Sequence, residues 1–272
     1  MRYKTIILFL CFAAIAAGAH AQPAQGIQNP LQKYLDGISY WRFQYSAEDT
    51  SFGHEVVALD SIYAMNDSLV EYLLNVAPQQ PGILKRKPVL AEDADMNIIT
   101  SEDKKLAIYC WNSHTGTSDF YNAIALYETT EGVKPLKIAN ASDAKEMQKA
   151  SGEFYNVIGV NSDKGDSYYI FLARVKMPEN NMLNIMTAYV LADNQLKTVE
   201  LFSGGPSSGK FITYIYDYMS NYDFEKMKEI HTVHLSKNGK KLYVPEVANN
   251  QMTGKWQVYN FDGSKFVYDT IE

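Results

Sequence analysis

The chain has 272 residues with 31 acidic and 25 basic side chains, which give a formal net charge of −6 at pH 7. An acidic chain without clusters of lysine and arginine is poorly suited to nucleic acid or to anionic lipid surfaces, so we expect neither partner. The length allows one large domain or two small ones. After the first 21 residues, no run is long and apolar enough to predict a membrane span.

The first 21 residues have the three parts of a secretory signal. Arg2 and Lys4 supply the positive start, and residues 6–17 form an uncharged apolar run that is too short for an uncleaved anchor. Ala19–Ala21 then places small residues at the positions that a signal peptidase reads. We therefore expect cleavage before Gln22 and a periplasmic or secreted location.

The cysteine content limits how the exported chain is stabilised. Cys11 lies inside the apolar run and follows Leu8–Leu10, where a lipidation site needs small residues, so we expect no lipid anchor. Removal of the signal leaves Cys110 as the only cysteine, which rules out an intrachain disulfide. Stability must then come from the hydrophobic core.

Residues 22–90 predict a helical region that ends in a linker. Asn29 and Pro30 are typical of a helix start, with asparagine as N-cap and proline at the first helical position. Apolar residues follow at helical spacing as far as Trp41.

A second helix is expected from about residue 55 to residue 77. Ser68–Glu71 has the sequence of a capping box. Pro78 should end the helix, and Gln79–Pro88 has the composition of a linker, so we place a domain boundary near residue 90. One apolar stripe of this helix consists of Leu69, Leu73 and Val76.

From about residue 96 the helical spacing gives way to short runs of aromatic and β-branched residues separated by turns. We interpret residues 91–272 as a mainly β domain of three tandem four-stranded antiparallel meanders, each resembling a propeller blade. Two runs, 106–111 and 168–173, are apolar on both faces, which is typical of central strands between layers. The three sets of runs are 98–100, 106–111, 123–127 and 133–138; 155–160, 168–175, 185–191 and 196–202; and 232–235, 242–247, 256–261 and 266–268.

The hairpin tips of the three sets are regularly spaced. The first and second tips, Asp103 and Gly132, Asp163 and Asn194, and Asn238 and Gly263, are 29, 31 and 25 residues apart. This regularity favours repeated blade-like units, but an irregular sandwich or barrel gives the same pattern, and a closed propeller needs at least four blades. Both architectures remain open from the sequence.

The segment Ile98–Trp111 resembles a signature of uncharacterised exported proteins of the Bacteroidetes, in which a Ser-x-Asp-x-x turn leads into an Ile-Tyr-x-Trp strand. Asn112–Thr117 resembles the Thr-Gly-rich loop that often follows, although Gly116 is its only glycine. Lys240–Pro245 and Trp256–Phe266 resemble the closing strands of these proteins, and the similarity extends over roughly residues 60–270. The resemblance implies an envelope or secreted location and brings no known activity.

One segment fits a nucleotide-binding pattern. Gly204–Lys210 matches the G-x-x-x-x-G-K spacing of a P-loop, but Phe211 stands where serine or threonine would hold magnesium. Residues 211–216 are typical of a strand, whereas a P-loop needs a helix whose N-terminal amides receive the phosphates. We interpret the segment as a strand connector and predict no cofactor.

Two patterns could indicate a metal. Asp93–Asn97 has the alternating oxygen ligands that open a calcium loop, but Ile98 replaces the required glycine and Lys104 replaces the bidentate glutamate. A solvated acidic loop is favoured, with a looser calcium site as the alternative. His231 and His234 face opposite ways if their segment is a strand, so we predict no metal there. The other histidines considered, His54 and His114, are isolated in sequence.

No catalytic set can be recognised. Cys110, although close to His114, lies in an apolar strand where a thiol is usually inert packing. The tyrosine-rich segments 168–169 and 214–218 could line a binding face but are more typical of cross-strand packing.

Two functions therefore remain. The first is a non-enzymatic exported module that binds a protein or a glycan. The alternative is a secreted hydrolase of glycan or cell-wall polymer, which requires a cleft with two carboxylates about 5–10 Å apart.

Overall fold

The structure is a computed structural model that describes residues 25–45, 57–86, 88–116, 118–139, 152–163, 165–206, 208–219 and 233–272. The expected signal peptide of residues 1–21, including Cys11, lies outside these ranges. Within the described ranges, no helix combines the length and the apolar character needed to cross a membrane.

Two helices precede the strands. They are α2 (Gln25–Ser39) and α3 (Ala58–Glu71). A π-helical turn (Tyr40–Gln44) follows α2, and a π-helical turn (Tyr72–Val76) and a 3₁₀ turn (Ala77–Gln79) follow α3.

The strands form three sheets, and all their pairings are antiparallel except that of β14 with β9. The first sheet has the order β1-β2-β3-β4 and contains β1 (Met96–Thr100), β2 (Leu106–Asn112), β3 (Tyr121–Thr129) and β4 (Gly132–Ala139). The second has the order β10-β7-β6-β5, with β8 also paired to β7, and contains β5 (Glu153–Asn161), β6 (Ser167–Lys176), β7 (Asn181–Ala192), β8 (Gln195–Thr198) and β10 (Phe211–Asp217). The third has the order β11-β12-β13-β14-β9 and contains β9 (Phe202–Ser203), β11 (His234–Leu235), β12 (Lys241–Ala248), β13 (Gln251–Phe261) and β14 (Phe266–Ile271).

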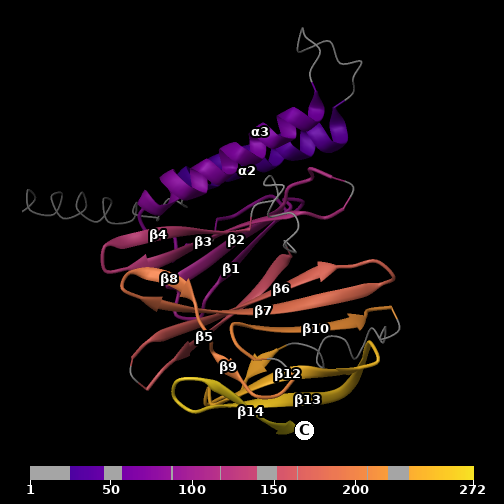
Figure 1. Ribbon diagram of the computed structural model, residues 1–272. Helices are drawn as coiled ribbons and strands as arrows, with labels where there is room; N and C mark the ends of the chain where they lie inside the picture. The colour runs from indigo at the N-terminus through magenta and orange to yellow at the C-terminus, as the bar shows by residue number, and fades with distance from the viewer. Residues whose placement is uncertain are drawn as a thin grey trace, which may run out of the picture.

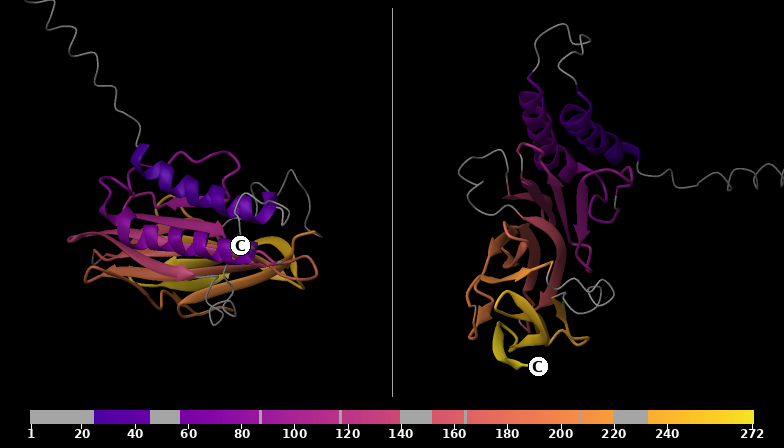
Figure 2. Two further views of the ribbon diagram at one scale, coloured as in Figure 1. Left: turned by 90° about the horizontal axis from the view of Figure 1, so that it is seen from above. Right: turned by 90° about the vertical axis from the view of Figure 1, so that its right-hand side faces the viewer.

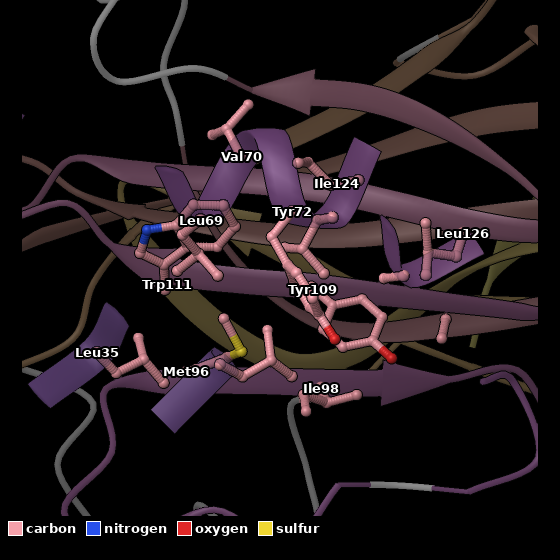
Figure 3. Close-up of a cluster of buried hydrophobic side chains, with 14 of the residues drawn as sticks. Leu35, Leu69, Val70, Tyr72, Met96, Ile98, Tyr109, Trp111, Ile124 and Leu126 are labelled. Carbon is pink, nitrogen blue, oxygen red and sulfur yellow. The ribbon is translucent and has the colours of Figure 1, made fainter. Parts of the chain in front are cut away.

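The helices and the three sheets are stacked as successive layers (Figure 1), and the side view in Figure 2 shows the same order from the helices to the C-terminus. A separate hydrophobic core fills each space between layers. The core between the helices and the first sheet includes Leu35, Leu69, Tyr72, Tyr109 and Trp111 (Figure 3). The core between the first and second sheets includes Ile108, Cys110, Ala125, Phe171 and Tyr189. The core between the second and third sheets includes Ile170, Leu172, Ile212, Val244 and Tyr259.

This layering explains the composition of the central strands. Every residue of β2 is buried, and six successive residues of β6 are buried, because both faces of these strands lie against another layer. In β12, at the end of the stack, buried and partly exposed residues mostly alternate. The two runs predicted to be central strands are therefore confirmed in that position.

The coarse prediction is confirmed: the chain is mainly β, its sheets are antiparallel apart from one short pairing, and two helices come first. The described strands do not close into a barrel or a propeller. Two details of the strand assignment differ from the expectation. The run expected at 196–202 divides between β8 and β9, which belong to different sheets, and β10 extends the second sheet beside β7.

The helix ends differ from the prediction. Helix α2 begins at Gln25 and contains Pro30, so Asn29 is not its N-cap. Ser68 lies inside α3, where its hydroxyl donates to the Ala64 carbonyl at 2.8 Å instead of capping a helix. Val76 is 44% exposed, because the π-helical turn rotates it away from the stripe of Leu69 and Leu73.

The expected linker also packs against the fold. Ile83 and Leu84 are buried in the core between the helices and the first sheet. The helical region and the first sheet therefore share one core.

Candidate functional site

A cavity of about 330 Å³ lies where α2 meets the first sheet. Its walls come from three segments: α2 with its π-helical turn, the turn that precedes β1, and the loop that follows β2. Four of its lining residues are acidic, namely Asp36, Glu92, Asp93 and Asp95.

A histidine and an aromatic ring complete the acidic cavity. His114 Nε2 lies 2.8 Å from Asp95 Oδ2, and the histidine side chain is 17% exposed whereas the aspartate is 55% exposed. Phe43 places its ring edge-on to the imidazole with 5.2 Å between ring centroids. Phe43 is 68% exposed, so its ring is accessible to a ligand at the cavity.

Local hydrogen bonds hold the loop that carries His114. Its backbone lies in the left-handed region with φ of 54°, which a residue other than glycine adopts only when its surroundings support it. Asn112 Oδ1 accepts the His114 N–H at 3.0 Å, and Asn112 Nδ2 donates to Asp119 at 2.8 Å. Ser113 and Thr115 share a hydroxyl hydrogen bond of 2.8 Å. The sequence Asn-Ser-His-Thr thus builds its own turn.

Hydrogen bonds of Asn66 in α3 link this loop to the first sheet. Its Nδ2 donates to the carbonyls of Ile62 and Ser113, both at 2.9 Å. Its Oδ1 accepts from Trp111 Nε1 at 2.8 Å and from Asn122 Nδ2 at 3.0 Å. Asn66 is fully buried, so every hydrogen-bonding position of its amide is occupied inside the protein.

Gln32 fixes the opposite wall. Its Nε2 donates to Asp36 Oδ1 at 2.7 Å, and its Oε1 accepts the Ala91 N–H at 2.8 Å. The Ala94 N–H bonds to the Ala91 carbonyl and closes the turn that holds Glu92 and Asp93. One side chain of α2 therefore orients a cavity carboxylate and anchors the acidic turn.

The chemistry of the cavity favours a cation. Carboxylates accept charge-assisted hydrogen bonds from ammonium and guanidinium groups, and an exposed aromatic ring adds a cation–π contact. Among the described residues, no group of three or more His, Cys, Asp and Glu is placed to hold a metal ion.

The residues of the possible calcium loop separate in the structure. Asp95 faces His114, whereas Asn97 in β1 donates to Glu153 of the second sheet at 2.8 Å. Asn97 therefore does not join Asp93 and Asp95, which line the cavity.

The other metal and nucleotide patterns also lack a site in the described ranges. His54 and His231 lie outside those ranges, and His234 of β11 stacks on Tyr243 with 4.9 Å between ring centroids. The segment Gly204–Lys210, of which Ser207 is not described, joins β9 to β10, and the strand predicted after it is present as β10.

Cys110 is buried between the first and second sheets, as predicted. Burial raises the pKa of its thiol to about 12, although its sulfur accepts the Phe154 N–H at 3.4 Å. A neutral buried thiol is a poor nucleophile. Tyr168, Tyr169 and Tyr214 are buried core residues, with Tyr168 facing the third sheet and Tyr169 the first, whereas Tyr216 and Tyr218 are partly exposed.

Sequence reasoning considered Asp95 and His114 separately and did not join them. The pairing of β1 with β2 sets Met96 opposite Trp111, so the register places Asp95 near Asn112, two residues before His114. That register was the available signal. Nothing in the sequence indicated that Asp36 and Phe43 would complete the cavity.

Comparison with known proteins adds no assignment to this geometry. No family model matches the sequence, and no curated protein matches it.

Proposed function

We propose that the chain is a non-enzymatic exported module of the cell envelope that binds a protein partner through the cavity beside α2. A lysine or arginine of the partner enters the cavity. The observation that carries the proposal is the gathering of four carboxylates and the exposed ring of Phe43 around one cavity of about 330 Å³. The signal sequence of residues 1–21 supports the exported location.

The walls of the cavity are held in place before any ligand arrives. Asn66 fixes the loop with His114, and Gln32 fixes the turn with Glu92 and Asp93. A site that needs little ordering loses less conformational entropy on binding, which supports recognition by a small number of contacts.

The scaffold itself consists, in this proposal, of three blade-like meanders in a row. Matching turns support a repeated unit. Ser101 Oγ donates to Asp103 Oδ1 at 2.6 Å in the first sheet, and Ser236 Oγ donates to Asn238 Oδ1 at 2.7 Å in the third. In both turns the serine hydroxyl also accepts the N–H of the residue five positions later.

A thermal-shift assay tests the binding proposal. We expect short glycine peptides that carry a single lysine or arginine to raise the melting temperature of the chain, because a ligand of the folded state stabilises it. The shift should be lost in the double variant Asp36→Asn, Asp95→Asn. Asp193→Asn makes the same chemical change at an exposed hairpin tip and should leave the shift intact. Equal shifts in the double variant and the wild type would refute the cavity as the site.

The second candidate is a hydrolase acting on glycan or cell-wall polymer. The specific observation in its favour is that Asp36, Asp95 and His114 line the same cavity, so acidic and basic groups face one space. Release of reducing ends from peptidoglycan or dietary polysaccharides, abolished by Asp95→Asn, would support this candidate over the binding module.

A further inference from the structure

The edge of β5 offers unpaired backbone groups at the middle of the stack. β5 is the last described strand of the second sheet, and β6 is the one described strand that pairs with it. Ser162 N–H bonds to the Asp166 carbonyl across the hairpin, which makes alternate residues of β5 face β6. The N–H and C=O groups of Gly159 and Asn161 therefore point away from β6. No described residue donates to or accepts from them.

Both ends of this open stretch are closed by neighbouring layers. The Asp163 N–H, which points the same way, reaches the Gly263 carbonyl of the third sheet at 3.3 Å. The Phe154 N–H reaches Cys110 of the first sheet. Gly159 and Asn161 thus form a short open edge between two layers, and both residues are exposed.

Gly159 is not required by the fold. A Cβ at this position would meet only Tyr169 Cε1, at 3.9 Å, which is an ordinary contact, and its φ is not in the left-handed region. Glycine weakens a strand interior and often marks the place where a ligand or another backbone approaches closely. The absence of a side chain at Gly159 leaves room for an approaching chain.

A cavity lies on each side of this edge. The cavity toward the first sheet measures about 260 Å³ and includes Glu102 and Asp103. The cavity toward the third sheet measures about 270 Å³ and includes Leu235 and Phe261. Residues 159–161 line both cavities.

We propose that the edge of β5 binds an extended peptide that adds as a strand, with alternate basic and apolar side chains entering the two cavities. The backbone of the peptide pairs with Gly159 and Asn161. Side chains of an added strand point alternately to the two faces of the sheet, so successive residues reach opposite cavities.

Charge and shape decide which side chain enters which cavity. The residue opposite Gly159 points toward the first sheet, because Gly159 pairs with Tyr169 and Tyr169 packs there. A lysine or arginine at that place meets the exposed carboxylate of Glu102. The next residue points toward Leu235 and Phe261, which suit an apolar side chain. This edge is distinct from the cavity beside α2.

The test uses the full chain with Asp36→Asn and Asp95→Asn, which removes the lysine site proposed beside α2, and a fluorescein-labelled peptide of alternating lysine and valine, followed by fluorescence anisotropy. We expect saturable binding to this parent double variant that weakens at least about tenfold when Gly159→Val is added, because the new side chain fills the space toward the first sheet. Thr213→Val places the same side chain on exposed β10 and should bind like the parent. Glu102→Gln should weaken binding, whereas Glu179→Gln, at an exposed turn, should not.

Two further peptides distinguish strand addition from simple charge attraction. A peptide N-methylated at the amides that face β5 keeps its charge but cannot pair, so it should not bind. A glutamate–valine peptide should also fail. Binding of the methylated peptide, or unchanged binding by Gly159→Val, would overturn the proposal. Absence of lysine–valine binding to the parent double variant would likewise overturn the proposal, whereas the thermal-shift response to single-lysine peptides reports on the cavity beside α2 alone.

Discussion

At the scale of single residues, Asn66 is the polar centre of the core between the helices and the first sheet. Its amide bonds to Trp111, Asn122, Ser113 and Ile62 without help from solvent. Such a group is hard to replace, because an apolar side chain of similar size leaves its buried partners unsatisfied.

We predict that Asn66→Leu lowers the free energy of unfolding by about 3 kcal/mol, the usual range for breaking a buried hydrogen-bond network. Urea denaturation measures the change. Asn75→Leu, at an exposed position beyond α3, is the matched control and should cost less than about 0.5 kcal/mol. Similar losses in the two variants would mean that the network contributes little.

Two buried tyrosines of the same core differ from Asn66 in how their polar atoms are paired. The hydroxyls of Tyr72 and Tyr109 have no hydrogen-bond partner within the described part of the chain, and Figure 3 shows both rings in the core. Burial raises the pKa of both hydroxyls. By contrast, Tyr169 donates its hydroxyl to Asp103 Oδ2 at 2.9 Å.

We therefore predict that Tyr109→Phe leaves stability unchanged or increases it by up to about 1 kcal/mol, because it removes an unsatisfied group. Tyr169→Phe, the same chemical change, should reduce stability by about 1–2 kcal/mol through loss of a bond to a charged acceptor. Chemical denaturation measures the free energy of unfolding of the two variants and of the wild type. A loss for Tyr109→Phe as large as that for Tyr169→Phe would indicate a partner for the Tyr109 hydroxyl.

At the scale of elements, the turn between β1 and β2 links the first and second sheets. Asp103 accepts from the Ser101 hydroxyl, the Lys105 N–H and the Tyr169 hydroxyl. Partial burial by itself would raise the pKa of Asp103, but these hydrogen bonds outweigh it and leave the pKa below its ordinary value of 3.8. The ionised carboxylate is therefore favoured in the folded state.

The sign of the pH dependence follows from this lowered pKa. Stability from the Asp103 carboxylate is complete above pH 3.8 and disappears as the pH falls through the lower folded-state value. We predict that Asp103→Asn is less stable than the wild type at pH 6 and that the difference shrinks below about pH 3.8. Urea titrations at several pH values measure it. A difference that stays constant with pH would show that the charge of Asp103 is irrelevant.

Elements built from local pairing could be predicted from the sequence. The hairpin of β1 and β2 was found because the apolar runs 98–100 and 106–111 lie on either side of a serine–aspartate turn. Helix ends were predicted less well, since Ser68 has the same sequence signature inside a helix as at its start.

The candidate site could be predicted only in part. The hairpin register brings Asp95 near Asn112, and the turn after β2 brings His114 to Asp95, so this contact depends on local information. Asp36 reaches them only because α2 packs on the first sheet, and that packing depends on contacts between segments far apart in the chain. Periodicity identifies the apolar face of a helix but not the sheet that it covers.

At the scale of the whole molecule, the stack has two different ends. The helices cover one face of the first sheet, and no described layer covers the outer face of the third sheet. The chain passes from the second sheet to the third at β9. This strand follows β8 of the second sheet and pairs in parallel with β14 of the third. Layers that contact only their neighbours can open separately, so local stability should vary along the stack.

We predict that hydrogen exchange follows this layering. Amides of β2 and β6 should exchange slowest, because these strands are paired on both sides and buried on both faces. Amides in residues 251–256 of β13 should exchange faster, since the side chains there are largely exposed. Mass spectrometry of peptides from residues 167–176 and 251–256 measures the contrast under native conditions. Equal protection of the two segments would mean that the three sheets unfold as one cooperative unit, because each exchange event would then require global opening.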